Sequence, residues 1–291
     1  MKKYRFTFLL FQFLTLCSCE FATEKLEIKP LQQKKSKIIT ANILSSTTTL
    51  SSNGPGNTYE LIDSVFGPSS EDLPDCGHTS FGRHIVEVFD NTLSQNVFVF
   101  YAHVNDDDDR CISSDKQRTE IKTHWLSSSN LRASNGDTVI YNWKFKIDLG
   151  FKPSPSFTNL HQIMAGNGDN AHPIFTLTPR YNSGGDKMEI VYMNSSGTIT
   201  KPKIVGLVGF KGHWVSVTET VVYGSTGSYS ININRISDNV NLLSYTNNNI
   251  EIFRLGTTWY RPKWGIYRGL ADSSYLRDEE VRFADFSITK F

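Results

Sequence analysis

The chain has 291 residues, of which 38% are hydrophobic, 12% aromatic and 20% charged. This composition is globular, too apolar and too aromatic for a disordered chain. Lys and Arg number 30 against 29 Asp and Glu, so the net charge of +1 does not favour nucleic-acid binding, and any site for a polyanion must be a local basic patch. No internal run reaches the roughly 18 apolar residues of a membrane-spanning helix.

Residues 1–19 have the pattern of a sorting signal. A basic start precedes an apolar run at 6–16, which is typical of a secretory signal peptide. The segment ends in Leu-Cys-Ser-Cys, which is similar to a bacterial lipobox with Cys19 as the lipidated residue. The alternative is an ordinary signal peptide that contains cysteines. We therefore expect an exported protein, either an outer-membrane lipoprotein at the cell surface or a secreted one, that contacts the membrane only through this anchor.

The other cysteines are Cys76 and Cys111. In an oxidising compartment two remaining cysteines predict one disulfide between them. The alternative is two separate buried thiols. A metal or nucleophilic role is less favoured, because neither cysteine has a C-x-x-C partner.

The sequence divides into three parts. After the signal, residues 20–58 carry charge, a Ser/Thr run at 45–52 and an Asn-Gly-Pro-Gly turn, which indicates a tether and linker. From residue 59 to 291 short alternating runs follow one another, and 59–66 could form one short helix. The runs expected as strands are 84–89, 96–103, 138–147, 174–178, 187–193, 213–223, 229–236 and 282–289. This spacing predicts an all-β single domain, a β-jelly roll or concanavalin-like sandwich of two antiparallel sheets.

Residues 117–124 form the first of three segments that could share a cleft. On a strand, Arg118, Glu120, Lys122 and His124 lie on one face, and Ile121 lies on the other with small residues. A solvated strand could carry the same charges. We favour a functional face, because long basic side chains around a carboxylate can bind a carboxylate or sulfate group.

Residues 157–164 form the second segment. Regular alternation places Leu160, Gln162 and Met164 on one face and His161 on the other, so His161 and Gln162 should not both enter one cleft. We keep His161 as a reserve candidate, because a bulge would turn it around.

Residues 261–268 form the third segment, in which Lys263, Gly265 and Tyr267 share a face. The glycine between Lys263 and Tyr267 would leave an open place where a substrate approaches the backbone. The alternative is a tyrosine packed on the sheet beside an exposed lysine.

Together the three segments resemble the β-jelly-roll polysaccharide lyases, a group that includes alginate, glucuronan, ulvan and heparin lyases. Alginate lyases carry an R-[TS]-E-[LV]-R strand, a Q-[IV]-H strand and a late Y-F-K-A-G-x-Y-x-Q strand. This chain has Arg-Thr-Glu-Ile-Lys at 118–122, Gln-Ile-Met at 162–164 and Lys-Trp-Gly-Ile-Tyr at 263–267. Met164 and Arg268 depart from the alginate pattern, so a glucuronan- or ulvan-like substrate is favoured over alginate or a heparin-type glycan.

The resemblance implies β-elimination on a uronic acid and assigns roles to residues. Gln162 and Arg118, with Lys122, would neutralise the uronate carboxylate, and Tyr267 would be the acid or would serve both proton transfers. His124 fits the order of the histidine in the glucuronan type and would be the base or a carboxylate partner.

Other residues would support these groups. Lys263 would lower the pKa of the Tyr267 phenol, and Glu120 would orient Arg118. Arg180, Arg261 and Arg268 would read sulfate or carboxylate groups at neighbouring subsites.

We expect no required cofactor. The acidic run at 106–109 is interpreted as a solvated loop, with a Ca²⁺ site as the alternative. The expected partner is an anionic polysaccharide bound by a monomer, with no nucleic acid.

Two other functions compete with the lyase. A non-catalytic carbohydrate-binding or surface glycan-binding protein could use the same basic face. A concanavalin-like glycoside hydrolase would need two carboxylates facing each other across a cleft, and the E-x-D-x-E type of strand is absent from the sequence. The lyase is favoured over the binding protein because a binder has no need for His124, Gln162 and Tyr267 together.

Overall fold

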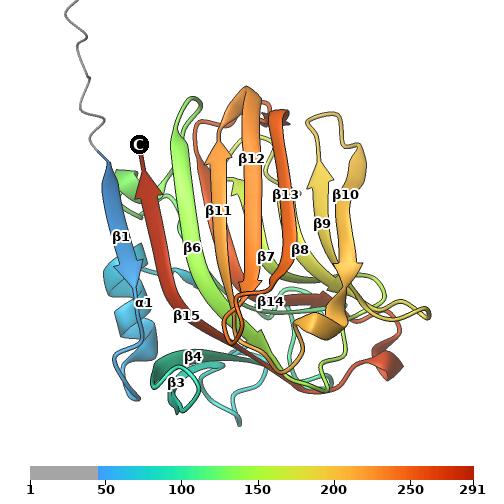
Figure 1. The fold of residues 1–291 in the computed structure, drawn as a ribbon. Coiled ribbons are helices and arrows are strands. Elements are labelled where there is room, and N and C mark those ends of the chain that lie inside the picture. Colours follow the sequence, from blue (N-terminus) through green and yellow to red (C-terminus); the bar gives the residue numbers. More distant parts are fainter. Residues whose placement is uncertain (1–44) are drawn as a thin grey trace, which may run out of the picture. The chain divides into compact units, whose positions relative to one another are not determined.

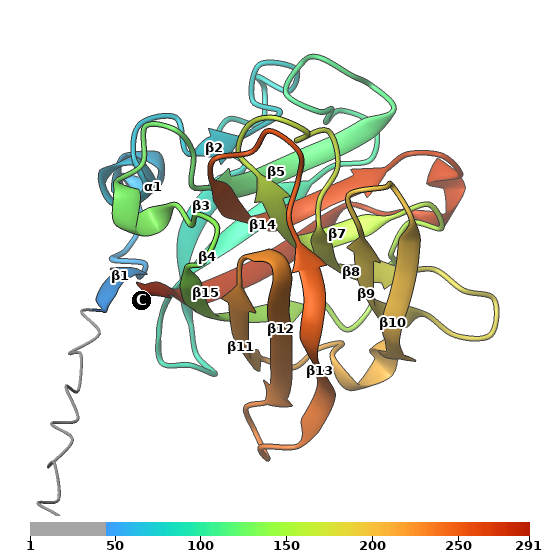
Figure 2. The same ribbon diagram turned by 90° about the horizontal axis from the view of Figure 1, so that it is seen from above.

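The computed structural model describes residues 45–291, and the alternating runs of this part of the chain form two antiparallel sheets that lie face to face (Figures 1 and 2). The expected all-β sandwich is confirmed. Cys19 and the signal segment lie outside the described residues. Within 45–291, no helix has both the length and the apolar character needed to cross a bilayer.

The first sheet, called sheet A, has the strand order β13-β12-β11-β6-β15-β4-β3, and β1 pairs with β15. Its strands are β1 (Ser46–Leu50), β3 (Ile85–Asp90), β4 (Gln95–Ala102), β6 (Thr138–Ile147), β11 (Val215–Val222), β12 (Gly224–Arg235), β13 (Asn241–Ile252) and β15 (Glu279–Lys290).

The second sheet, called sheet B, has the order β10-β9-β8-β7-β14-β5-β2. Its strands are β2 (Glu71–Asp72), β5 (Lys116–Lys122), β7 (Thr158–Ala165), β8 (Phe175–Arg180), β9 (Lys187–Met193), β10 (Ile199–Gly206) and β14 (Tyr260–Gly269). The three segments expected to share a cleft are β5, β7 and β14, and they are neighbours, with β14 between the other two.

The core lies between the sheets and is rich in aromatic side chains. Trp264 of β14 packs against Trp143 of β6 and Phe286 of β15, with ring centroids 5.9 and 5.2 Å apart. All three side chains are buried. Large aromatic rings that interlock in this way hold sheet B at a fixed distance from sheet A, which makes the outer face of sheet B a rigid platform.

The Ser/Thr run expected to be a linker instead forms β1, so the sandwich begins before residue 59. β1 pairs along β15 in antiparallel register, with Leu50 opposite Phe286 and fully buried. Three successive β-branched threonines, 47–49, favour this extended pairing over a flexible tether. The helix predicted at 59–66 is confirmed as α1 (Thr58–Phe66), which lies beside β1 (Figures 1 and 2).

The outermost strand of sheet B is β10, which pairs with β9 alone in the sheet. Most of its side chains are exposed or half-buried. The register against β9 shifts between Thr200 and Lys203, on either side of Pro202. Proline lacks the N–H that a ladder requires, so its place on an edge strand at an irregularity follows from its chemistry.

Candidate active site

A pocket of about 370 Å³ lies on the outer face of sheet B. The strands β5, β7 and β14 and the segment before β8 supply its walls. Its lining residues include Arg118, Asn159, Gln162, Met164, His172 and Tyr267. Of the expected catalytic residues, the structure therefore brings Arg118, Gln162 and Tyr267 together.

Strand register explains this meeting. On one side of β14, Tyr267 lies opposite Arg118 of β5, and on the other side it lies opposite Asn159 of β7. Four residues earlier, Lys263 lies opposite Gln162. Side chains that face the same way on paired strands are close neighbours, so three short segments distant in sequence build one surface.

Tyr267 stands half-buried at the centre of the pocket. The guanidinium carbon of Arg118 lies 3.5 Å from the centroid of its ring, a cation–π contact. The ring of Phe157 meets it edge-on at 4.9 Å. Within residues 45–291 the Tyr267 hydroxyl forms no hydrogen bond, so a ligand in the pocket can reach it.

Burial raises the pKa of Tyr267, and the positive charge of Arg118 opposes this effect only in part. Lys263 does not have the expected influence on the phenol. Its Nζ donates to Asp72 Oδ2 at 2.6 Å and to Glu120 Oε2 at 3.1 Å, and it is buried between them. The cation that favours the phenolate is therefore Arg118.

Arg118 is held by two carboxylates. Its Nε donates to Asp109 Oδ1 at 2.7 Å, and one terminal nitrogen donates to Glu120 Oε2 at 2.6 Å. The second terminal nitrogen reaches the other oxygen of Asp109 at 3.2 Å. This fork fixes the guanidinium plane under Tyr267, which a lysine could not do. Glu120 therefore orients Arg118, the role expected for it.

Glu120 is fully buried and joins the three strands. It accepts hydrogen bonds from Arg118 on its own strand, from Lys263 on β14 and from the side-chain amide of Gln162 on β7. A buried carboxylate needs such partners to stay ionised. The pKa of Glu120 is lowered because Lys263 and Arg118 outweigh the effect of its burial.

Lys122 lies at the far end of this network from Tyr267. Its Nζ donates to Asp72 Oδ1, so Asp72 bridges Lys122 and Lys263. Lys122 is not among the residues that line the pocket, although its side chain is partly exposed.

Strand β7 departs from the expected alternation. Asn159 and Gln162 both line the pocket although they are three residues apart, while Leu160 and His161 are both turned to the core. The pairing with β14 shifts between Trp264 and Tyr267, which produces this arrangement. Grouping Leu160 with Gln162 was therefore wrong.

His161, kept in reserve, faces the interior. Its Nε2 lies 2.9 Å from Glu219 Oε2 of β11, and its Nδ1 lies 2.8 Å from the Lys263 carbonyl oxygen. Both side chains are almost wholly buried. This pair joins the two sheets across the core and contributes nothing to the pocket.

Gly265 does not leave open space for a substrate. A Cβ at this position would lie 2.1 Å from the Thr119 carbonyl oxygen, and the φ angle is +149°. The glycine is required because the backbone of β5 approaches β14 closely, so the expectation of a substrate opening there was wrong.

His124 is not among the pocket residues. It follows the end of β5, is buried, and its Nε2 lies 2.6 Å from the Pro68 carbonyl oxygen. Burial lowers its pKa. The side chain connects the end of β5 to the segment after α1 rather than to Tyr267.

The histidine that does line the pocket is His172, which lies outside the three segments singled out in the sequence. It lies just before β8, is exposed, and forms no hydrogen bond with other residues of 45–291. No local sequence signal could have found it, because it reaches the pocket through the course of the loop between β7 and β8.

The three arginines expected at neighbouring subsites have different surroundings. Arg180 lies in an adjacent pocket of about 150 Å³ that shares Asn159 and Phe157 with the first one. Arg261 lies opposite Met164, and within 45–291 it has no ion-pair partner and its Nε is buried without an acceptor. Arg180 is already paired with Glu189, to which its Nε donates at 2.8 Å, so Arg261 is the less engaged of the two.

Arg268 cannot take part in such a subsite. It is fully buried on the other face of β14, where its guanidinium donates to Gln117 Oε1 at 2.7 Å and to the carbonyl oxygens of Arg277 and Ala102. Regular alternation after Tyr267 turns it inward, so its expected substrate role was wrong.

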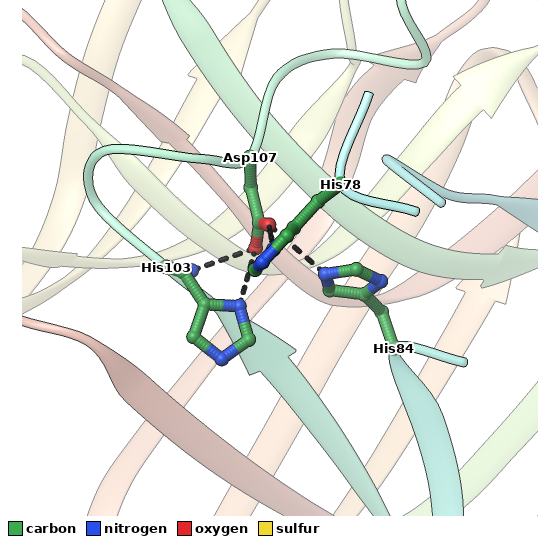
Figure 3. A group of neighbouring side chains, drawn as sticks. All are labelled: His78, His84, His103 and Asp107. Carbon is green, nitrogen blue, oxygen red and sulfur yellow. Dashed lines mark hydrogen bonds and ion pairs between the residues drawn. The ribbon is translucent and has the colours of Figure 1, made fainter. Parts of the chain in front are cut away.

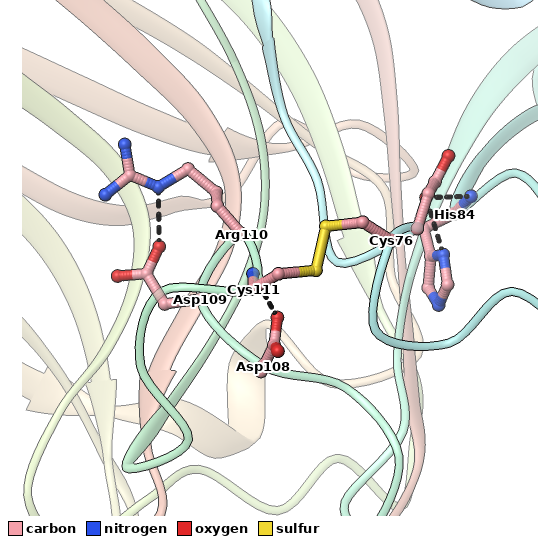
Figure 4. The surroundings of a disulfide bond; sticks show 7 residues. Cys76, His84, Asp108, Asp109, Arg110 and Cys111 are labelled. Carbon is pink, nitrogen blue, oxygen red and sulfur yellow. Dashed lines mark hydrogen bonds and ion pairs between the residues drawn. A yellow bond between two sulfur atoms is a disulfide. The ribbon is translucent and has the colours of Figure 1, made fainter.

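The expected disulfide between Cys76 and Cys111 is confirmed (Figure 4).

The acidic run next to Cys111, residues 106–109, is not a solvated loop, because Asp107 and Asp109 are buried. Asp109 holds Arg118, Asp108 accepts from the Cys111 backbone N–H at 2.7 Å, and Asp107 contacts histidines. The carboxylates of the acidic run thus bind separate partners and do not form the cluster of oxygen ligands that Ca²⁺ needs.

The chain is therefore a β-jelly roll with a pocket on the outer face of sheet B that contains Arg118 and Tyr267. No protein-family model matches the sequence, and no curated protein matches it. Solved structures of polysaccharide lyases share the fold. The PL-14 alginate lyase of Aplysia kurodai is 17% identical, with a TM-score of 0.55 over 84% of this chain and 99% of that one.

Two further lyases are similar at the level of the fold. The endo-β-1,4-glucuronan lyase of Trichoderma reesei is 14% identical, with a TM-score of 0.50 over 70% of this chain and 85% of that one. The family 7 alginate lyase A1-II′ is 16% identical, with a TM-score of 0.52 over 75% and 90%. The chain thus has the jelly-roll fold of these enzymes over most of its length.

Proposed function

We propose that the protein is a polysaccharide lyase that cleaves a uronic-acid-containing polysaccharide by β-elimination. One observation carries the proposal: the hydroxyl of Tyr267, which has no hydrogen-bond partner within residues 45–291, lies in the same pocket as Arg118, Gln162 and Asn159. A phenol that can exchange a proton beside donors that can bind a carboxylate is the arrangement this reaction needs. The shared fold of alginate and glucuronan lyases supports it by analogy.

The reaction removes the C5 proton of a uronate and breaks the bond between C4 and its glycosidic oxygen. The C5–H electron pair forms the C4=C5 double bond, and the leaving oxygen takes up a proton. Charge develops on the uronate carboxylate as the C5 proton departs. Arg118 and Gln162 each use one N–H group on Glu120, and their remaining N–H groups, with the amide of Asn159, line the pocket as the donors assigned to stabilise it.

We assign proton donation to the leaving oxygen to Tyr267. For removal of the C5 proton, the pocket offers two groups, the same phenol and the imidazole of His172. His172 takes the place that the sequence suggested for His124, because the Nε2 of His124 is engaged with the Pro68 carbonyl. The imidazole of His172 is exposed and forms no hydrogen bond within residues 45–291, so it is available to act as a general base.

A glucuronan- or ulvan-like polymer remains the favoured substrate, with Arg180 and Arg261 at the flanking subsites. The signal at 1–19 and the disulfide support export, either to the cell surface through Cys19 or into the medium. We expect the domain to act as a monomer without a catalytic cofactor.

The test is incubation with glucuronan, ulvan, alginate and a heparin-type glycan, followed by the ultraviolet absorbance of the unsaturated uronate. Absorbance that rises with one polymer and is lost in Tyr267→Phe would support the lyase and name its substrate. Binding of a polymer in an affinity gel with no rise in absorbance for any of the four would contradict the proposal. That outcome would favour the alternative, a glycan-binding protein that uses the same pocket.

A further inference from the structure

Three histidines and one aspartate converge at a place outside the pocket. His78 and His84 belong to the segment that leads into β3, and His103 and Asp107 belong to the segment between β4 and β5. Figure 3 shows the four side chains pointing toward one another. One atom from each, an imidazole nitrogen or a carboxylate oxygen, lies within 4.8 Å of all the others.

The carboxylate of Asp107 is the centre of this group, called here the His₃Asp cluster. Its Oδ1 lies 2.7 Å from His78 Nδ1 and 2.9 Å from His84 Nε2, and its Oδ2 lies 3.1 Å from His103 Nδ1. The three rings are 5.0 to 5.4 Å apart between centroids. Oδ2 also accepts the backbone N–H of His103, so every acceptor position of this one carboxylate is directed at the three histidines. Three imidazoles that meet at one carboxylate are a set of side chains that can all become metal ligands.

The surroundings of His84 are those of a metal ligand. Its Nδ1 lies 2.7 Å from Asp75 Oδ1, while Nε2 points to the centre of the cluster. Asp75 is held in turn by the Tyr59 hydroxyl at 2.8 Å. A carboxylate on the outer nitrogen fixes the tautomer that presents a lone pair to a metal, and metal-bound histidines commonly carry such a partner.

The cluster is also shaped for a small ion. The side chains of His84 and Asp107 are 0% and 1% exposed, while those of His78 and His103 are 13% and 16% exposed. The two buried ligands form a floor, and the other two leave access from solvent. In a tetrahedral zinc site the ligand atoms are about 3.3 Å apart, so small side-chain rotations would suffice.

We propose that His78, His84, His103 and Asp107 bind one Zn²⁺ ion in a closed tetrahedral site. Imidazole nitrogen with one carboxylate oxygen suits zinc, whereas Ca²⁺ would require six or more oxygen ligands. Four protein ligands leave no position for a substrate, so the ion is structural. The proposal stands on these side chains alone and does not depend on the proposed lyase activity.

The ion would fasten the segment that positions Arg118. Asp107 and Asp109 are two residues apart, and Asp109 holds the guanidinium under Tyr267. The Cys76–Cys111 disulfide joins the same two segments, two residues before His78 and four after Asp107. Disulfide and ion together would form a double cross-link between the segments.

The experiment measures zinc directly in the full chain. Protein stripped with a chelator is titrated with Zn²⁺ alone and, in a parallel arm, with Ca²⁺ alone. Bound metal is counted by elemental analysis, and melting temperature is followed. We expect one Zn²⁺ per chain and, at zinc about a hundred times above Kd, a rise in melting temperature of roughly 5–10 °C. Co²⁺ bound in its place should give the visible spectrum of a tetrahedral ion.

Variants locate the ion. His103→Ala and His78→Gln should each weaken zinc binding by at least about 10-fold and, at the same zinc concentration, lower the rise in melting temperature by about half or more. The side chains of His103 and His78 are both partly exposed. The melting temperature of each metal-free variant shows whether that variant folds. His213→Ala removes an exposed histidine elsewhere and should bind zinc like the parent chain.

Three outcomes would overturn the proposal. They are no stoichiometric zinc in the parent chain, zinc affinity unchanged in folded His103→Ala and His78→Gln, and stabilisation by Ca²⁺ but not by Zn²⁺. Loss of lyase activity alone would not count as support, since it could arise in the pocket.

Discussion

The guanidinium carbon of Arg118 lies 3.5 Å from the centroid of the Tyr267 ring, and Asp109 and Glu120 accept hydrogen bonds from the same guanidinium. The contact joins the residue proposed to transfer protons to the residue proposed to bind the uronate carboxylate. The two residues are opposite each other on paired strands, so their side chains are direct neighbours on one face of sheet B. This geometry determines the expected effects of substitutions in the pocket.

Replacing Tyr267 with Phe removes only the hydroxyl, which has no hydrogen-bond partner within 45–291. We expect kcat for β-elimination to fall by at least about 10³-fold with little change in polymer affinity or melting temperature, since packing against Phe157 is retained.

His172→Ala should lower kcat for β-elimination by about 10²-fold or more if the imidazole removes the C5 proton. Activity of His172→Ala equal to that of the parent chain would leave Tyr267 to perform both proton transfers.

Arg118 should control the pH dependence of activity. Its positive charge opposes the rise in the pKa of Tyr267 that burial causes, so its removal should raise that pKa further. In Arg118→Gln, any limb of the kcat/KM profile that reports phenolate should move to higher pH, with an overall loss of about 10²-fold. Arg118→Lys is the matched control, which keeps the charge but loses the fork. An unchanged pH profile in Arg118→Gln would contradict the assignment of this limb to Tyr267.

Asp72 should contribute stability that depends on pH. Burial acts to raise its pKa, but Lys263 and Lys122 outweigh that effect and lower it. A lowered pKa in the folded state gives stability that is present above the ordinary value of 3.8 and is lost as pH falls below it. Asp72→Asn should cost about 3–5 kcal/mol at neutral pH, because Lys263 loses a buried partner, and less in acid.

Urea unfolding of the parent chain and Asp72→Asn at about pH 7 and about pH 3 measures this difference. Asp106→Asn, an exposed carboxylate outside the network, serves as the control and should change stability little. A difference between the parent chain and Asp72→Asn that stays constant across this range would show that the ion pairs are not its source.

Glu71, next to Asp72, should have the opposite effect. Its burial and the nearby charge of Asp63 raise its pKa to about 8, and one of its oxygens is buried without a partner. A raised pKa means that the folded state holds the proton more tightly, so stability falls as pH rises between about 4.5 and 8.

Glu71→Gln should remove this loss, because glutamine resembles the protonated carboxyl and does not ionise. Part of the side chain is solvated, so we expect a gain of roughly 1–2 kcal/mol at about pH 9 and little change at about pH 5. Thermal unfolding of the parent chain and of Glu71→Gln at the two pH values measures this gain. A gain of equal size at both values would contradict the role of ionisation.

The fold could be predicted because most strands carry regular alternation. The runs at 138–147 and 187–193 coincide with β6 and β9, and that at 282–289 falls within β15. β10 and β13 were missed, since the Lys-Pro-Lys of the first and the Asn-rich centre of the second weaken the apolar pattern. Both carry many exposed side chains, so burial left little signal in their sequences.

Within the site, alternation predicted which face of β5 and β14 carries Arg118 and Tyr267. It failed where strands depart from regular pairing, as at Leu160, and where a loop brings a residue into place, as for His172. It also could not predict the His₃Asp cluster, whose members come from two loops that meet only in three dimensions. Tertiary contacts of this kind have no local signature.

Pro202 lies on β10, an edge strand of sheet B, and affects how two copies of the protein can associate. An unpaired β-edge is a template on which a second chain can add a strand and from which fibrils grow. Here the interrupted register of β10 and the missing N–H of Pro202 break the row of donors, and Lys203 adds positive charge beside it, whereas Lys201 is paired with Glu189. A second copy that approaches this edge meets like charge and an incomplete ladder, so the edge resists self-association at high local concentration.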